Sequence, residues 1–193
     1  MILVIDTSSA ISAVALLDAS GEVIREERHL SGKTFDLPAV FRSLAIPAPL
    51  SKVGVAAGPG SFTGLRVGVA FGVGLAMGLR IPIVPLPTLS IQAARSDRPV
   101  IAVAEAGRGR IYFQGPGAEP ALGEPAELPS GWDVVGWLRP STEQAMKDAG
   151  LSFVADSDLA TFGVAAGHLL KSAREAAYGS VKIAYMQSFS AKA

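Results

Sequence analysis

Short apolar runs separated by turn residues dominate the start of the chain. Residues 2–5 and 11–17 are apolar and flank a polar turn at 7–9, which predicts two antiparallel strands. A second turn at 18–21 leads into residues 22–29, where apolar and charged residues alternate unevenly, as they do in an exposed strand. The pattern therefore predicts a three-stranded meander.

Helical periodicity begins at residue 37. Apolar residues recur at the spacing of one helix face from Leu37 to Leu44, with Asp36 as the N-cap and Pro38 in the first turn. Strand, helix, strand and helix patterns then follow at residues 53–57, 65–79, 81–84 and 88–95. This alternation predicts a mixed α/β layer in which the first hairpin gives way to crossover connections.

The composition turns polar near residue 96, where we place a boundary between an N-terminal lobe (1–96) and a second lobe (97–193). Strands are expected at 100–104 and 110–114, around a glycine-rich turn. Four prolines make residues 115–131 rich in loops, with edge strands at most.

The last predicted element is a helix of the second lobe, capped by residues 156–158. Its apolar residues share one face, and Gly179 follows its end. These residues are Leu159, Phe162, Ala166, Leu169, Leu170 and Ala173.

Composition narrows the function classes. Hydrophobic residues make up 49% of the chain and charged residues 18%, which is typical of a well-buried globular protein. The 17 basic and 17 acidic side chains cancel, so the overall basic field of a free-standing nucleic-acid binder is absent. The lack of cysteine excludes disulfides, thiolate zinc sites and a cysteine nucleophile.

Targeting features favour the cytoplasm. No basic stretch precedes the first apolar run, so it does not resemble a secretory signal. The longest apolar run, residues 67–79, is shorter than the roughly 20 residues that span a bilayer. We expect that run to form a buried helix, and we expect the protein not to contact a membrane.

Two segments could contact a nucleotide or another anion. Asp6 and Thr7 end the first strand, in a corner that resembles the phosphate and metal corner of actin, hexokinase and Hsp70 ATPases. Gly58, Gly60 and Ser61 lie in a loop between a strand and a helix, where backbone N–H groups can hold a phosphate. The alternative is a structural tight turn, because the glycine spacing is neither the dinucleotide fingerprint nor a P-loop.

The helix after this loop carries a stripe of small residues, Gly64, Gly68, Gly72 and Ala76, at four-residue spacing. Glycine inside a helix is unfavourable by about 1 kcal/mol relative to alanine, so close packing is the natural compensation. A partner helix could contact this stripe; the alternative is a central helix buried wholly by its own chain.

Metal and hydrolase chemistry are not favoured. His29 and His168 are the only histidines, and neither has a second ligand at metal-binding spacing. Ser-His-Asp catalysis would need a Gly-x-Ser-x-Gly elbow, which the sequence lacks. We expect no metal site.

The motif Gly58-Pro-Gly-Ser-Phe-Thr-Gly-Leu-Arg-Val-Gly68 closely resembles the TsaB (YeaZ) family. Residues 2–7 resemble the opening strand of that family, 81–84 its next strand, and 106–112 its Asp-Ala-Arg-x-Gly-Glu-Val-Tyr segment. The likeness is strong for about residues 1–95 and thins afterwards.

The resemblance implies an α/β fold of the actin-like ATPase (ribonuclease H-like) type, with two lobes of which the second is reduced. It implies a non-catalytic subunit that needs no cofactor of its own and pairs with the catalytic relative TsaD through helices of the N-terminal lobe. With the ATPase TsaE, the pair supports threonylcarbamoyl transfer to the tRNA adenosine beside the anticodon. We therefore expect a homodimer in isolation, a nucleotide at the partner interface, and tRNA contact only through the complex. The residues assigned to pairing are Leu37, Val40, Phe41, Gly64, Gly68, Gly72 and Ala76.

The chain departs from the family at Glu105, Gly107 and Arg110, where Asp, Arg and Glu are usual. Residues 30–51 are also shorter than usual. Two alternative functions remain open. One is an active actin-like ATPase or sugar kinase that uses Asp6 and the glycine-rich loop. The other is a glycoprotease-like hydrolase, for which no metal ligands are visible in the sequence.

Overall fold

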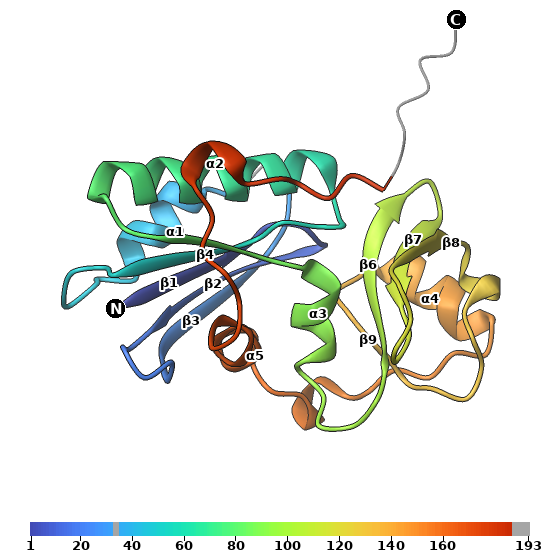
Figure 1. The fold of residues 1–193 in the computed structure, drawn as a ribbon. Helices are drawn as coiled ribbons and strands as arrows, with labels where there is room; N and C mark the ends of the chain where they lie inside the picture. Colours follow the sequence, from blue (N-terminus) through green and yellow to red (C-terminus); the bar gives the residue numbers. More distant parts are fainter. Residues whose placement is uncertain (33–34, 187–193) are drawn as a thin grey trace, which may run out of the picture.

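The computed structural model describes residues 1–32 and 35–186, which form two sheets side by side (Figure 1). The first sheet has five strands in the order β3-β2-β1-β4-β5. Its strands are β1 (Ile2–Asp6), β2 (Ile11–Leu17), β3 (Val23–Leu30), β4 (Lys52–Ala56) and β5 (Ile83–Leu86). The first three form the predicted antiparallel meander, and β4 and β5 run parallel to β1, as the crossover pattern predicted.

Alternating side chains of β1 divide the first lobe into two cores. Leu3 and Ile5 point to the side covered by α1 (Leu37–Ser43) and α2 (Phe62–Leu79). Val4 points to the opposite side, which α5 (Phe162–Leu170) covers. Figure 1 shows α2 above the sheet and α5 below it. The predicted cap of α1 is confirmed, because the Asp36 side chain accepts a hydrogen bond from the Ala39 N–H.

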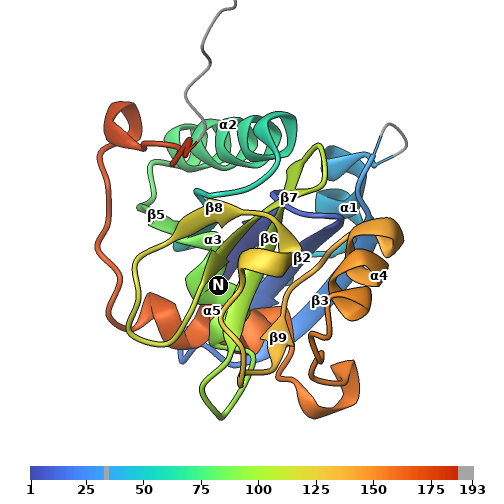
Figure 2. The same cartoon turned by 90° about the vertical axis from the view of Figure 1, so that its right-hand side faces the viewer.

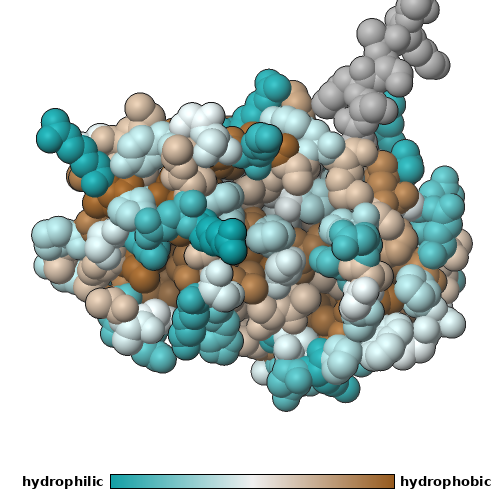
Figure 3. Space-filling model, viewed as in Figure 1, coloured by the Kyte–Doolittle hydropathy of each residue, from teal (hydrophilic) through white to brown (hydrophobic). Residues whose placement is uncertain are grey.

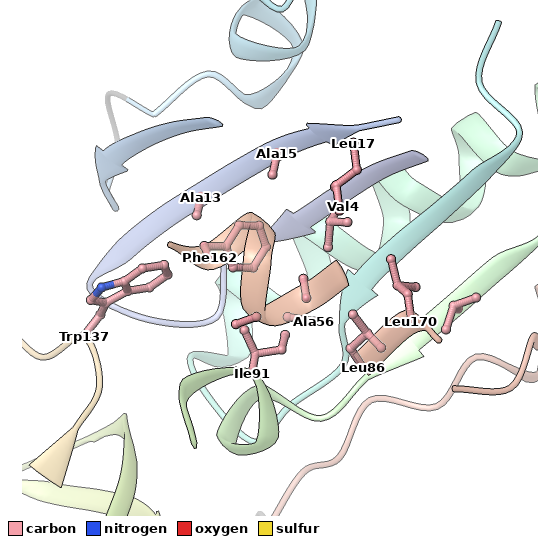
Figure 4. Packing of buried hydrophobic residues seen from close by; sticks show 13 residues of the cluster. Val4, Ala13, Ala15, Leu17, Ala56, Leu86, Ile91, Trp137, Phe162 and Leu170 are labelled. Carbon is pink, nitrogen blue, oxygen red and sulfur yellow. The ribbon is translucent and has the colours of Figure 1, made fainter. Parts of the chain in front are cut away.

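The C-terminal helix α5 belongs to the first lobe, so our assignment of this helix to the second lobe was wrong. Phe162 is fully buried and packs with Ala13 and Ala15 of β2 (Figure 4). A Cβ on Gly163 would lie 2.7 Å from a Val23 methyl group, so glycine allows the helix to approach the sheet this closely. The helix starts later than predicted, with Thr161 rather than residues 156–158 as its cap.

The second sheet has four strands in the order β8-β7-β6-β9 (Figure 2). The hairpin of β6 (Ile101–Gly107) and β7 (Arg110–Gln114) confirms the predicted strand pair. The short strand β8 (Ala121–Gly123) lies at the sheet edge, in the loop-rich stretch where edge strands at most were expected. The strand β9 (Val134–Val135) and the helix α4 (Pro140–Asp148) were not predicted. Helix α4 was missed because it is mostly polar and buries only Thr142 and Met146.

One further helix and three short 3-10 turns complete the described structure. Helix α3 (Thr88–Ala93) follows β5 and packs against β6, and 3-10 turns form at Pro125–Glu127, Asp156–Asp158 and Tyr178–Ser180. Just after α3, the Arg95 side chain is 2% exposed and donates to Asp156 at 2.6 Å and to Gln92 at 3.1 Å. Its guanidinium also lies over the Trp137 ring. Burial lowers the pKa of Arg95, although Asp156 opposes that shift.

Helix α2 is long and apolar enough to cross a membrane by length and composition alone. Core helices of soluble proteins pass the same test, so this is weak evidence for a span. Its buried residues, Leu65, Gly68, Val69, Gly72 and Ala76, lie against the first sheet.

Candidate functional site

The corner after β1 is closed by its own side chains. Asp6 is fully buried, and its Oδ1 accepts hydrogen bonds from the Ser8 N–H at 2.8 Å and the Ser8 hydroxyl at 2.6 Å. Its Oδ2 has no partner among the described residues. Desolvation raises the pKa of Asp6, and the two bonds from Ser8 only partly oppose that shift. The Asp6 side chain is thus enclosed by the chain itself.

The glycine-rich loop packs closely onto this corner. A Cβ on Gly60 would lie 2.5 Å from the Ser8 carbonyl oxygen, and the Ser61 N–H donates to that same oxygen at 2.7 Å. Gly58 has a φ of 104°, and a Cβ there would lie 2.8 Å from the Ala184 carbonyl oxygen. These glycines are needed for close approach of the chain to itself. The predicted anion contacts at Asp6, Gly58 and Gly60 stay predictions, because backbone N–H groups rather than Cβ positions would hold an anion.

Thr7 and Ser61 remain on the wall of a cavity of about 580 Å³ between the lobes. Their polar groups are already engaged, because the Thr7 hydroxyl donates to the Gly64 carbonyl and the Ser61 hydroxyl accepts from the Gly64 N–H. On the facing wall, Glu105 accepts from the Arg139 N–H at 3.1 Å and the Thr142 hydroxyl at 2.8 Å. Glu105 thus caps α4, a role that the sequence did not suggest.

The stripe of Gly64, Gly68, Gly72 and Ala76 faces the chain's own sheet. A Cβ on Gly64 or Gly68 would collide with Thr7, and one on Gly72 with Val55. Ala76 is fully buried. The stripe lets α2 lie directly on β1 and β4, so its assignment as a partner surface was wrong and the alternative, burial by the same chain, is correct.

The other predicted pairing residues are also mostly internal. Leu37 and Val40 are 1% and 8% exposed and belong to the core beneath α1 and α2. Phe41 is partly exposed, and its ring meets Phe71 edge-on at a centroid distance of 5.5 Å. Of the seven residues assigned to pairing, Gly64 lines the cavity between the lobes, and Phe41 borders an open surface along α2.

That open surface, which we call the outer α2 face, consists of Val67, Ala70, Gly74, Met77 and Gly78. Val67 is 45% and Met77 53% exposed, and a Cβ on Gly74 or Gly78 would meet nothing within 4 Å. A groove of about 440 Å³ runs along it, between α2 and Pro38, Phe41 and Arg42 of α1. In Figure 3 hydrophobic and hydrophilic side chains are mixed along the upper edge, where α2 lies. Periodicity could have found this face, because Ala70, Gly74 and Gly78 also recur every four residues.

No metal centre is evident in the described ranges, where no three His, Asp or Glu side chains are grouped. His29 is exposed and bonds Glu27, and His168 is exposed on α5. Both lie away from the cavity lining.

Comparisons with known proteins match this chain to proteins named TsaD, TsaB and YeaZ. A family model described as TsaD: tRNA N6-adenosine threonylcarbamoyltransferase matches residues 40–124. The tRNA threonylcarbamoyladenosine biosynthesis protein TsaB of Bacillus subtilis (strain 168) is 36% identical over 120 residues, or 58% of this chain and 52% of that protein. The chain therefore matches about half the length of this curated relative.

Solved structures share the fold over almost the whole chain. YeaZ from Pseudomonas aeruginosa superposes with a TM-score of 0.74 at 22% identity, covering 96% of this chain and 99% of that chain. A structure described as an uncharacterized protein with similarity to peptidase YEAZ from Pseudomonas aeruginosa has a TM-score of 0.69 at 19% identity, with the same coverage. The predicted resemblance to the TsaB (YeaZ) family is confirmed.

Proposed function

We propose that this chain, a TsaB (YeaZ) relative, pairs with a TsaD-type protein and supports threonylcarbamoyl transfer to the tRNA adenosine beside the anticodon. A role in the synthesis of threonylcarbamoyladenosine is supported by the B. subtilis relative and by the TsaD family match. The observation that carries the pairing role is the exposed, apolar outer α2 face.

The outer α2 face suits a second helix. Small residues at Ala70, Gly74 and Gly78 leave the backbone accessible, and the exposed Val67 and Met77 supply apolar area on either side. The groove beside Phe41 would receive a side chain of the partner helix. We propose that the corresponding helix of TsaD occupies this face in the complex, and that a second copy of the chain occupies it in isolation.

We further infer an actin-like (ribonuclease H-like) fold. A mixed sheet of order β3-β2-β1-β4-β5 followed by a smaller sheet that opens with its own hairpin supports this assignment. In this role the chain would act in the cytoplasm, with TsaD and TsaE, and would meet tRNA as part of the complex.

The proposed role is non-catalytic and needs no cofactor bound to this chain alone. The buried Asp6 and the closed glycine-rich loop support it, because an ATPase would need both to face its nucleotide. The purified chain is expected to hydrolyse ATP at background rate. ATP turnover that Asp6→Asn abolishes would favour the ATPase or sugar-kinase alternative.

Pairing is tested by co-expression with TsaD from the same organism and measurement of the affinity of the purified proteins. Gly74→Glu places a bulky carboxylate in the centre of the outer α2 face, where the free chain has room for it. We expect association to weaken at least about 100-fold, because the carboxylate would be desolvated in the complex and would keep a partner helix from the backbone. Gly74→Ala should bind within a few-fold of wild type.

Circular dichroism and melting temperature serve as controls for folding. If wild type does not bind TsaD or raise threonylcarbamoyl transfer, the proposed function is wrong. If wild type binds but folded Gly74→Glu binds equally well, the pairing surface lies elsewhere.

A further inference from the structure

An arginine near the N-terminal end of α2 lies against two exposed aromatic rings that also contact each other. The Arg66 guanidinium carbon lies 3.8 Å from the Phe62 ring centroid and 5.9 Å from that of Tyr185. Its Nε donates to the Tyr185 hydroxyl at 3.1 Å. This arrangement fixes the plane of the guanidinium, whose two terminal nitrogens make no hydrogen bond or ion pair with a described residue.

The same surface continues onto the second lobe. Met186, next to Tyr185, packs against the cluster that contains Tyr112 of β7. Arg110 lies two residues before Tyr112 and therefore on the same face of the sheet, and it is exposed. Its positive charge also lowers the pKa of Tyr112, partly opposing the rise that burial causes, in accord with their proximity. In Figures 1 and 2 the tip of the β6–β7 hairpin and α2 both lie on the upper side of the molecule.

The chemistry of this surface suits a nucleic-acid strand. A guanidinium group without a carboxylate partner can donate two parallel hydrogen bonds to the oxygens of one phosphate. The fixed plane of the Arg66 guanidinium lowers the entropic cost of binding. The rings of Phe62 and Tyr185 are 38% and 42% exposed, so a base can stack on the uncovered part of Tyr185. An acidic peptide would use the guanidinium groups but not the exposed rings.

We propose that Phe62, Arg66, Tyr185 and Arg110 form an RNA-binding surface, with phosphates on the two guanidinium groups and a base on Tyr185. The inference rests on the proposed function, in which the RNA is the tRNA substrate. The chain has no net charge, so this local surface would add to binding by the complex rather than hold tRNA tightly alone.

The test measures binding of a fluorescent, unmodified tRNA transcript with adenosine beside its anticodon. Fluorescence anisotropy is recorded against salt for the isolated chain and for its complex with TsaD. Arg66→Glu and Arg110→Glu should each weaken binding about tenfold and reduce the slope of log affinity against log salt by about 1. Tyr185→Ala should weaken binding about tenfold or more through lost stacking.

Arg174→Glu is the matched control. It makes the same charge change at an exposed site next to Glu175, which borders a hollow with Arg80 at the opposite end of α2. Binding by this variant should stay within about twofold of wild type, because the changed charge lies outside the proposed surface and salt screens its effect over that distance. If Arg66→Glu does not fold, Arg66→Gln replaces it and should still reduce affinity and salt slope.

The outcomes separate this inference from the proposed function. Unchanged tRNA affinity of a complex that contains folded Arg66→Glu overturns the RNA surface and leaves the pairing role intact. Loss of TsaD binding with unchanged tRNA affinity makes the surface a protein contact, which also overturns it. If no complex with TsaD forms, the proposed function fails. The tRNA affinities of the isolated wild-type chain and its variants then show whether the surface binds RNA.

Discussion

Gly72 and Gly74 lie two residues apart on α2, and a methyl group added at each would meet opposite surroundings. A Cβ on Gly72 collides with the Val55 side chain of β4, whereas one on Gly74 meets nothing within 4 Å. Overpacking typically costs about 1–3 kcal/mol, and replacing a helical glycine by alanine gains about 1 kcal/mol. We expect Gly72→Ala to lower the free energy of unfolding by about 1–2 kcal/mol and Gly74→Ala to raise it by up to about 1 kcal/mol. Urea unfolding followed by circular dichroism measures both, and equal effects would contradict this packing of α2.

Asp6 makes stability depend on pH. Burial raises its pKa in the folded chain above the ordinary value of 3.8, so the folded state favours the protonated carboxyl. The stabilisation of the folded state by the protonated Asp6 carboxyl is therefore fully present below pH 3.8 and is lost as pH rises through the raised pKa. Asp6→Asn keeps an acceptor oxygen for the Ser8 N–H and hydroxyl but cannot ionise. Its stability relative to wild type should rise as pH increases from 4 to 7 in urea unfolding experiments, and parallel pH profiles would argue against this role.

Helix α5 is anchored to the first sheet by a carboxylate as well as by its apolar face. Glu26 of β3 accepts hydrogen bonds from the Gly163 N–H at 2.7 Å and the Phe162 N–H at 3.3 Å. These groups would otherwise be unpaired donors at the positive end of the helix. Glu26→Ala should lower the free energy of unfolding by about 1–3 kcal/mol in urea. Glu22 is exposed just before the same strand, and Glu22→Ala should alter the free energy of unfolding by less than about 0.5 kcal/mol. An equal loss of stability in both variants would show that the hydrogen bonds from α5 to Glu26 do not cause the effect.

The two lobes are held together through Arg95. Its buried side chain joins the end of α3 to Asp156, to the Ala160 carbonyl and to the Trp137 ring. Arg95→Met keeps much of the volume but removes these bonds, and should lower the free energy of unfolding by about 3 kcal/mol. Arg98→Met removes an exposed ion pair with Asp133 and should cost at most about 1 kcal/mol. Denaturant unfolding followed by tryptophan fluorescence compares the two variants, and similar losses would contradict a special role for Arg95.

The order and type of most elements followed from the sequence by itself. Periodicity is a local property, so the meander, α1, α2 and the β6–β7 hairpin could be predicted from their own residues. The family resemblance was equally local, because it rested on the motif at residues 58–68. Helix α4 and the short strand β9 escaped prediction, since their polar or very short segments carry no strong pattern.

The tertiary structure alone decided which surface each element covers. Helix α2 has small residues on two sides, and only the packed sheet shows that Gly68 and Gly72 face inward while Gly74 and Gly78 stay open. Asp6 and the glycine-rich loop have the composition of an anion site, but only the structure shows that Asp6 bonds Ser8 and that the loop packs against Ser8 and Ala184. Likewise α5 lies on the first sheet although its sequence follows the second lobe. Local patterns determine which residues are apolar or small, whereas the contacts that cover them come from segments distant in the chain.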